Sequence, residues 1–331
     1  MERKKQNASK RKNKKVINIA KTSIQPGEMK SINLPVANLP NHVMLDLPVV
    51  VLNGLHAGPV LWVSAAVHGD EVNGVLMIRD IVNRIDVNTL SGTIIAVPVV
   101  NVFGFIHQSR YLPDRRDLNR SFPGSKRGSL ASRMANIFMK EIISQSDFGI
   151  DIHTGSHNRT NAPQIRVDKR DNNAVKLAKA FSAPILIYKS PENGSLRKTA
   201  EELGVPNIIF EGGEANRFDR DIIKSGTSGI LRVLKHLKMI KNLKVSNLDK
   251  KRITITCENS VWIRAKQSGI LKVMVSGGQS VKKGDVLAHI SDVYGENRND
   301  IYAPLSGIVI GQSVNTIVYQ GDAVIHIGLL A

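Results

Sequence analysis

Short apolar segments alternate with segments of helical periodicity as far as about residue 240. Pro48 to Asn53, Val60 to Val67 and Gly92 to Val100 have the length and apolar content of buried strands. Between the last two, apolar residues recur at helical spacing from Glu71 to Ile85, which predicts an amphipathic helix. The alternation also predicts a strand that ends at Asp151 to His153 and strands over Pro184 to Tyr188 and Pro206 to Phe210. Helices are predicted near Ser129 to Ser144, Asn172 to Phe181, Ser195 to Leu203 and Asp219 to Met239. Residues 104–128 are predicted to form a loop. We therefore predict an α/β fold with a mixed, mostly parallel sheet flanked by helices.

After about residue 246 the chain has short apolar segments broken by glycine and no helical pattern. It contains an internal repeat: Ser268 to Ile270 and Gly284 to Ile290 recur, 37 to 38 residues later, as Ser306 to Ile308 and Gly321 to Ile327. Duplicated strands of this kind predict a small all-β sandwich of two similar halves, which resembles the biotinyl/lipoyl-type barrel-sandwich fold. Carriers of that fold need a lysine on the turn between the halves, and no lysine follows Lys283. We therefore predict a structural or gating module.

The positive charge of the chain is concentrated in two blocks. The chain has 46 Lys and Arg against 28 Asp and Glu, a formal charge of +18. Residues 1–15 carry +7 and residues 235–252 carry +6, so the remainder carries only about +5. The first block predicts a disordered basic tail, with contact to nucleic acid or an acidic partner as the alternative. The second block interrupts an apolar helix pattern and predicts an exposed helix face followed by a linker.

The cysteine count and the apolar runs restrict the class of protein. The single cysteine, Cys257, excludes an internal disulfide and a zinc site built on cysteines, so a metal would have to be held by His and carboxylate. The longest apolar run, Pro59 to Val67, is far shorter than the roughly 20 residues that span a bilayer. Charged residues occupy the N-terminus where a secretory signal would be apolar. We expect a soluble, cytoplasmic protein with no membrane contact.

Candidate metal ligands follow two of the predicted strands. His68 comes directly after an apolar strand and Glu71 lies three residues later, where a helix is predicted to start, so both side chains can face one point. His153 ends a second strand. Two His and one Glu leave one coordination position open for water, which is the ligand set of hydrolytic zinc sites. The alternatives are an ordinary polar strand end and, for His153, a hydrogen-bonded core histidine.

Two further clusters are candidates for substrate binding and proton transfer. The adjacent Asn119 and Arg120 combine an amide with a guanidinium fork, which can hold a substrate carboxylate; a charged surface loop is the alternative. Glu211 ends an apolar strand before two glycines, which suits a general base, with a helix-capping or salt-bridge role as the alternative. Glu214, in the same Glu-Gly-Gly-Glu run, is a second candidate for that base.

Four segments, in this order, resemble the succinylglutamate desuccinylase/aspartoacylase family, a branch of the zinc carboxypeptidase-like hydrolases: His68-Gly69-Asp70-Glu71, Asp117-Leu118-Asn119-Arg120, the strand that ends at His153, and the run from Ile208 to Glu214. The resemblance covers roughly residues 48–240, and the trailing β module is similar to one found in many members. It implies that His68, Glu71 and His153 bind one Zn²⁺ per chain. It also implies that Asn119 and Arg120 hold a substrate carboxylate, that Arg110 polarises the scissile carbonyl, that Glu211 is the catalytic base and that Asp117 orients a zinc-binding histidine.

This resemblance implies a division of the chain and an activity. Residues 1–15 form the basic tail, 16–245 the zinc hydrolase domain and 246–331 the lipoyl-like module without an attachment lysine. The expected reaction is hydrolysis of an amide bond in an N-acyl amino acid or a related small amide that carries a carboxylate. The alternatives are a carboxypeptidase that trims acidic peptide tails and a non-catalytic protein that binds nucleic acid through its basic blocks; the metal-ligand set argues against the latter. The acyl group and a homo-oligomeric state stay open.

Overall fold

The structure, a computed structural model, describes residues 15–39, 41–156, 158–241 and 254–330. The first part of the chain contains β1 (Ile17–Ile19), β2 (Thr22–Ile24), β3 (Glu28–Asn38), β4 (Met44–Asn53), β5 (His56–Ala65), α2 (Asn73–Arg84), β6 (Ser91–Val97), α3 (Val102–Ile106), the short 3₁₀ helices η1 (Leu118–Arg120) and η2 (Ile143–Gln145), α4 (Leu130–Glu141), β7 (Phe148–Gly155), β8 (Arg159–Val167), α5 (Asn172–Phe181), β9 (Ile185–Tyr188), α6 (Leu196–Glu202), β10 (Asn207–Glu214) and α7 (Arg220–His236). The C-terminal part contains β11 (Ile255–Arg264), β12 (Gly269–Val273), β13 (Ser280–Val281), β14 (Val286–Ser291), β15 (Asn299–Tyr302), β16 (Gly307–Ser313), β17 (Ile317–Val318) and β18 (Ala323–Leu330).

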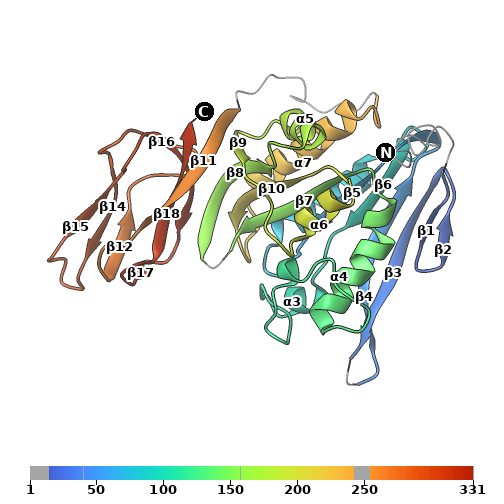
Figure 1. Cartoon of the computed structure of the whole chain (residues 1–331), viewed down its shortest axis with the longest axis horizontal. Coiled ribbons are helices and arrows are strands. Elements are labelled where there is room, and N and C mark those ends of the chain that lie inside the picture. Colours follow the sequence, from blue (N-terminus) through green and yellow to red (C-terminus); the bar gives the residue numbers. More distant parts are fainter. Residues whose placement is uncertain (1–14, 40, 157, 242–253, 331) are drawn as a thin grey trace.

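A single 12-stranded sheet runs through both parts of the chain, in the order β13-β16-β18-β11-β9-β8-β10-β7-β5-β6-β4-β3. Its centre is parallel, because β6, β5, β7 and β10 pair in the same direction, whereas both ends are antiparallel. Figure 1 shows the C-terminal strands at one side of the molecule and β3 and β4 at the other. The predicted mixed α/β fold is confirmed, with its parallel pairing concentrated where the sheet is covered by helices.

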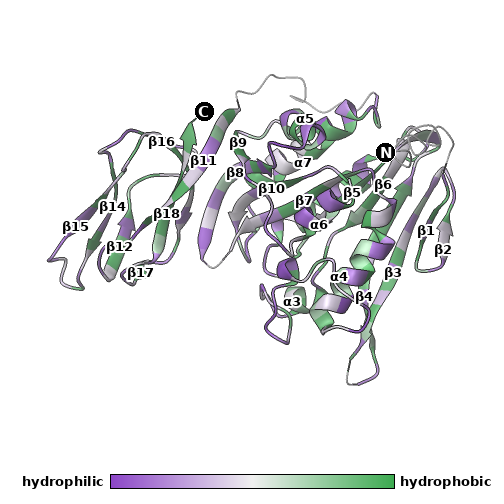
Figure 2. Cartoon of the chain, viewed as in Figure 1, coloured by the Kyte–Doolittle hydropathy of each residue, from purple (hydrophilic) through white to green (hydrophobic). Residues whose placement is uncertain are grey.

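Each face of the central sheet packs against its own set of helices. One core contains Ile150 and Ile152 of β7 together with apolar residues of α2, α5 and α7. The other contains Trp62 of β5 with residues of α4, α6 and the N-terminal strands. Successive side chains of a strand point to opposite faces. Because both faces of the central sheet are covered, β5 is apolar on both faces over most of its length, whereas β7 also carries polar residues (Figure 2).

Gly229 brings α7 against α5 on the first of these faces. A Cβ at this position would lie 2.1 Å from Cε1 of Phe181, which is fully buried and stacks on Phe210 with ring centroids 5.0 Å apart. Alanine normally stabilises a helix relative to glycine, but here the methyl group would displace the Phe181 ring. We predict that Gly229→Ala lowers the free energy of unfolding by about 1–3 kcal/mol in denaturant titrations. Lys224→Ala on the same helix, at an exposed position, should change it by less than about 0.5 kcal/mol, and an equal effect of both variants would contradict this packing argument.

The predicted repeat forms two sheets that exchange short strands. In the first half β12 pairs with β14, and in the second half β16 pairs with β18. The short β13 of the first half pairs with β16, while β17 of the second half pairs with β12, so each half completes the sheet of the other. A separate apolar core lies between the two sheets. The module is joined to the main sheet because β11 pairs in parallel with β9 and β16 pairs with β8.

Some predictions on secondary structure need correction. The apolar pattern did not predict the strands within residues 17–38, and it did not predict β8, from Arg159 to Val167. Pro163 and several polar residues obscure the strand pattern of β8, which is stabilised by its neighbours β10 and β9. Residues 1–14 of the predicted basic tail and most of the predicted linker lie outside the described residues. Among the described helices, none is both long and apolar enough to cross a bilayer.

Candidate functional site

Three parallel strands bring the candidate residues to one edge of the sheet. β5, β7 and β10 run side by side in the same direction, so their carboxyl ends are adjacent. His68 follows β5, Glu71 lies just before α2, and His153 lies near the carboxyl end of β7. Glu211 of β10 lies directly opposite His153 in the strand register. Ligands commonly bind at this end of parallel strands.

His68, Glu71 and His153 form a compact buried group. Each is at most 4% exposed, and one ligand atom from each lies within 4.8 Å of the others. Glu71 holds both rings: Oε1 lies 2.8 Å from Nδ1 of His68, and Oε2 lies 2.8 Å from Nδ1 of His153. The backbone N–H of Thr154 also donates to Oε2, at 3.1 Å. Two imidazole nitrogens and a carboxylate therefore converge on one point.

A carboxylate holds the far nitrogen of each histidine. Nε2 of His68 lies 3.2 Å from Oδ1 of Asp117, and Nε2 of His153 lies 2.8 Å from Oδ2 of Asp151. Asp151 is itself fixed by the hydroxyl of Ser64, which donates to Oδ1 at 2.7 Å. These contacts orient both rings with Nδ1 toward Glu71. Asp151 was not among the predicted site residues, although its position two residues before His153 places it on the same face of the strand.

Charge coupling within this group shifts the pKa of every member. Burial raises the pKa of the Glu71 carboxyl, but His68 and His153 outweigh burial and hold that pKa well below its usual value. Burial lowers the pKa of His153, but Asp151 and Glu71 outweigh it and hold the pKa well above the usual value. The pKa of His68 is also raised, because Glu71 and Asp117 outweigh its burial. The group therefore favours bound protons on its histidines unless a cation replaces them.

Because His68 and His153 both favour the protonated state, we predict that metal binding depends on pH. A metal needs the unprotonated Nδ1 of His68 and of His153, so each ion bound should release at least one proton near neutral pH. Because both pKa values are raised, the apparent metal affinity should fall as pH decreases. Calorimetric titration of zinc in two buffers of different ionisation enthalpy measures the release directly. Identical heats in both buffers between about pH 6 and 8 would contradict the coupling.

The position of Asp151 predicts a role in metal affinity. With Asp151→Asn, the amide can no longer accept a charge-assisted hydrogen bond from His153 and hold its ring in place. We expect metal affinity to fall about 10- to 100-fold, measured by competition with a chelator. Asp86→Asn, at an exposed turn remote from the group, serves as the control. Equal affinities of the two variants would show that Asp151 does not support the site.

The group forms part of the lining of a cavity of about 230 Å³. Its lining includes Arg110, Asn119, Arg120 and Glu211 from the predicted site. The lining also includes Arg159, together with residues that were not predicted as site residues: Asn161, Arg166, Lys189, Glu192, Arg197, Trp262 and His326. Trp262 and His326 belong to β11 and β18 of the C-terminal module, where their rings stack with centroids 4.3 Å apart. The module therefore supplies one wall of the cavity.

Comparison with known proteins identifies the family. The model of the succinylglutamate desuccinylase/aspartoacylase catalytic domain matches residues 57–237, more than half of the chain. The chain belongs to this family. As a family member it is a deacylase-type amidohydrolase, and its buried His-Glu-His group is consistent with a metal site.

Relatives of this family cover nearly the whole chain. N-alpha-acetyl-L-2,4-diaminobutyric acid deacetylase of Halomonas elongata is 24% identical over 278 residues, which is 81% of each chain. A succinylglutamate desuccinylase/aspartoacylase structure from Rhodobacter sphaeroides has a TM-score of 0.83 at 23% identity and covers 95% of this chain and 100% of that chain. The product-bound ectoine utilization protein of Ruegeria pomeroyi has a TM-score of 0.81 at 24% identity, with 96% and 100% covered. These structures show a shared fold.

The arginines and the amide predicted for substrate contact are held by neighbouring groups. Arg110 donates through one terminal nitrogen to Oδ2 of Asp117 at 2.8 Å and through the other to Oε1 of Glu71 at 3.3 Å. Arg120 is ion-paired with Glu192 and also donates to the backbone carbonyl of Asn119 at 2.7 Å. The side-chain carbonyl of Asn119 accepts from the backbone N–H of Leu196 at 2.9 Å. All three predicted residues therefore border the cavity in fixed orientations.

The two candidate bases differ in their surroundings. Glu211 lines the cavity; its Oε2 accepts a hydrogen bond from Nδ2 of Asn161 at 2.9 Å and is ion-paired with Arg166 at 2.7 Å. Within the described part of the chain, Oε1 of Glu211 has no hydrogen-bond donor. Glu214 is not part of this lining; it contacts Arg217 at 3.3 Å at the surface. This arrangement favours Glu211 over Glu214 as the proton-transfer group.

Proposed function

We propose that the protein is a zinc-dependent hydrolase that cleaves the amide bond of an N-acyl amino acid or a related small amide with a carboxylate. The observation that carries this proposal is the buried His68, Glu71 and His153 group, which lines the same cavity as Glu211 and Arg110. The cavity is small and its lining is polar, so it suits a small metabolite better than a segment of a folded protein. The proposal assigns residues 16–245 to the hydrolase domain and 246–331 to a module that walls the pocket.

The donor set fits zinc. Two imidazole nitrogens and one carboxylate form the protein side of a hydrolytic zinc site with an open position. The far nitrogens of the two rings donate to Asp117 and Asp151, which leaves both Nδ1 atoms as the available ligand atoms. Bound there, Zn²⁺ would supply a Lewis acid that polarises the acyl oxygen and increases the acidity of water.

The side chains around the His-Glu-His group transfer the protons and stabilise the charge that develops in the reaction. Glu211 accepts a proton from water as the water oxygen bonds to the acyl carbon, and it then delivers that proton to the nitrogen as the C–N bond breaks. The immediate products are a carboxylic acid and an amine; transfer of the acid proton to the amine gives a carboxylate and an ammonium, so atoms and charge balance. Arg110, fixed by Glu71 and Asp117, stabilises the negative oxygen of the tetrahedral centre with its remaining N–H groups. Asn119 and Arg120 hold a substrate carboxylate; for Arg120 this requires exchange of its partner Glu192.

A substrate screen tests this function. The purified chain should release free amine from N-acyl amino acids, including N-acetyl-L-aspartate, N-succinyl-L-glutamate and N-acetyl-L-2,4-diaminobutyrate, only with metal present. Oligoglutamate serves as the comparison substrate, because a carboxypeptidase would shorten it. Shortening of oligoglutamate with no release from any N-acyl amino acid would overturn the proposal in favour of a carboxypeptidase.

A further inference from the structure

Five strands close into a ring where the C-terminal module joins the main sheet. β8 pairs with β9, β9 with β11, β11 with β18 and β18 with β16, and β16 pairs with β8 again. A separate apolar cluster includes residues from four of these strands: Ala162, Ile185, Ile187, Cys257, Ile308 and Ile310. A small closed sheet is filled by its own side chains, so a polar side chain that points inward needs a partner there.

Gln164 of β8 is a polar residue on the side of the sheet that faces this apolar cluster. In the strand register it lies opposite Glu211 of β10 on one side and next to Ile185 of β9 on the other. Residues that are paired in register share a face of the sheet, and Ile185 belongs to the apolar cluster. Gln164 and Glu211 therefore point to the same side of the sheet, and Gln164 is fully buried there.

Within the described residues the amide of Gln164 has no hydrogen-bond partner. Its Oε1 and its Nε2 are both buried, and both are unpaired in this part of the chain. A buried amide without partners is costly, whereas a methionine of similar length would fill the same space without that cost. Packing alone therefore does not account for a glutamine at this position.

Glu211 offers the hydrogen bond that this amide lacks. Its Oε2 is held by Asn161 and Arg166, and within the described residues its Oε1 has no donor. Side chains directly opposite each other on antiparallel strands have Cβ atoms about 4.5–5.5 Å apart, so rotation of the Gln164 side chain can bring Nε2 to Oε1 of Glu211. A carboxylate oxygen has two lone pairs, so Oε1 can accept this bond and still take a proton.

We propose that Gln164 is a positioning residue for Glu211: after rotation of its side chain, Nε2 donates to Oε1 of Glu211 from the buried side. This inference rests on the proposed function and adds a residue to it. With both oxygens held, the plane of the carboxylate is fixed, and the second lone pair of Oε1 is left for the proton of the attacking water. The described lining of the cavity does not include Gln164, so Gln164 acts through Glu211.

Gln164→Met tests this role, because it removes both polar atoms and keeps the length of the side chain. We expect kcat on an N-acyl amino acid to fall about 10- to 100-fold, while KM and zinc content stay within about a factor of three. The midpoint of denaturant unfolding should stay equal or rise, because an unsatisfied buried amide is removed. A lower midpoint with unchanged kcat would show a merely structural glutamine and contradict the proposal.

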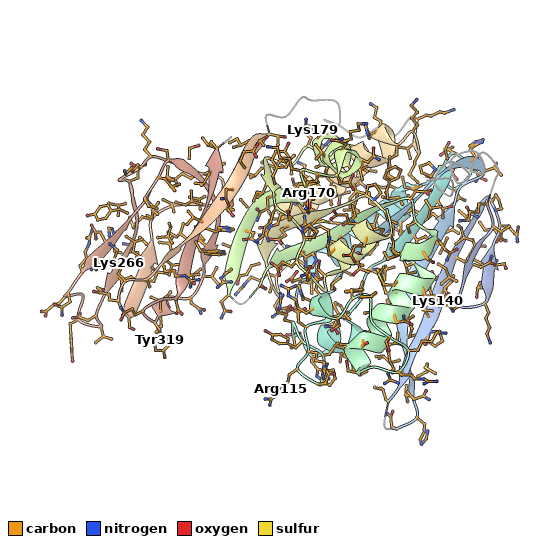
Figure 3. The ribbon with its side chains drawn as sticks, in the orientation of Figure 1. Arg115, Lys140, Arg170, Lys179, Lys266 and Tyr319 are labelled. Atoms are coloured by element: carbon orange, nitrogen blue, oxygen red, sulfur yellow. The ribbon has the colours of Figure 1, made fainter. Side chains whose placement is uncertain are left out.

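Gln312→Met is the matched control. Gln312 belongs to β16 of the same ring, and its Oε1 is also buried without a partner among the described residues, but its neighbours in register are Thr160 and Ile325. Lys179→Met, at an exposed position of α5, controls for a surface substitution (Figure 3). Both controls should leave kcat within about a factor of two to three. An equal fall of kcat in Gln312→Met and Gln164→Met would contradict the assignment.

A double-mutant cycle shows whether Gln164 acts through Glu211. In Glu211→Gln the base is already lost, so the addition of Gln164→Met should change the residual kcat by less than about threefold. In the wild-type chain the same substitution should have its full effect on kcat. If the two losses multiply in the double variant, Gln164 acts independently of Glu211 and the positioning role is overturned.

Nuclear magnetic resonance separates the contact from the proposed reaction. The side-chain amide signals of Gln164 are identified by their loss in Gln164→Met, and we expect their protons to be protected from exchange with solvent until Glu211→Ala removes the acceptor. Loss of protection in Glu211→Ala, with no turnover of any amide by the wild-type chain, would support the contact and defeat the proposed function. Turnover by the wild-type chain, with unchanged signals in Glu211→Ala and unchanged kcat in Gln164→Met, would defeat the positioning role alone.

Discussion

Replacing Glu211 by glutamine is expected to reduce kcat by about 10²- to 10⁴-fold while the zinc content of the protein stays unchanged. Glutamine keeps the shape of the side chain and can still accept a hydrogen bond from Asn161 or Arg166, so the pocket should stay folded. It cannot take a proton from water or return one to the leaving amine. The measurement is kcat on an N-acyl amino acid together with metal analysis of the same preparation.

Glu214→Gln is the matched control for this variant. Glu214 is on the same strand but contacts Arg217 and lies outside the lining of the cavity, so its substitution should leave kcat within about a factor of two to three. Full activity of Glu211→Gln would exclude Glu211 as the base. Loss of activity in Glu214→Gln with activity retained in Glu211→Gln would transfer the role to Glu214.

Replacing His153 by alanine is expected to remove both the metal and the activity. The substitution deletes one of the converging nitrogens and leaves Glu71 buried with a single imidazole partner. Loss of the metal should cost about 4 kcal/mol or more of transition-state stabilisation, or at least about 10³-fold in kcat/KM. Metal analysis and kcat/KM with added zinc measure the two effects, and Glu211→Gln provides the contrast of an inactive variant that retains metal.

His289→Ala is the control for His153→Ala. His289 also lies 2.8 Å from an aspartate, Asp300, but it belongs to β14 of the C-terminal module and lies outside the lining of the cavity. Its substitution should leave both metal content and kcat/KM unchanged. Full zinc content in His153→Ala would show that the ion binds elsewhere.

The sequence was informative about the centre of the fold and of the site because both depend on local patterns. His68 and His153 could be placed together because each follows an apolar strand, and neighbouring parallel strands end at one edge. Asp151 carried a similar signal, the alternation of a strand, which was not used. The helix predicted over Asn172 to Phe181 matches α5 because its apolar spacing is regular and Asp171 caps it.

The part of the cavity lined by Arg166, Arg197, Trp262 and His326 could not be predicted, because it depends on contacts between distant segments. Arg166 belongs to β8, whose strand pattern is broken by Pro163 and polar residues. Trp262 and His326 reach the cavity only because β11 adds to the sheet beside β9, an association with no local sequence signal. In the sequence, Arg197 is an ordinary residue of a predicted helix, and only the packing of α6 shows that its side chain is buried.

The central claim is a zinc-dependent deacylase, and metal analysis coupled to turnover tests it most directly. The chain, purified without added metal, should contain close to one zinc ion per molecule and release amine from an N-acyl amino acid. A chelator should abolish this release, and zinc should restore it in proportion to the ion bound. Turnover of the same substrate at full rate by protein that contains no metal would contradict the account.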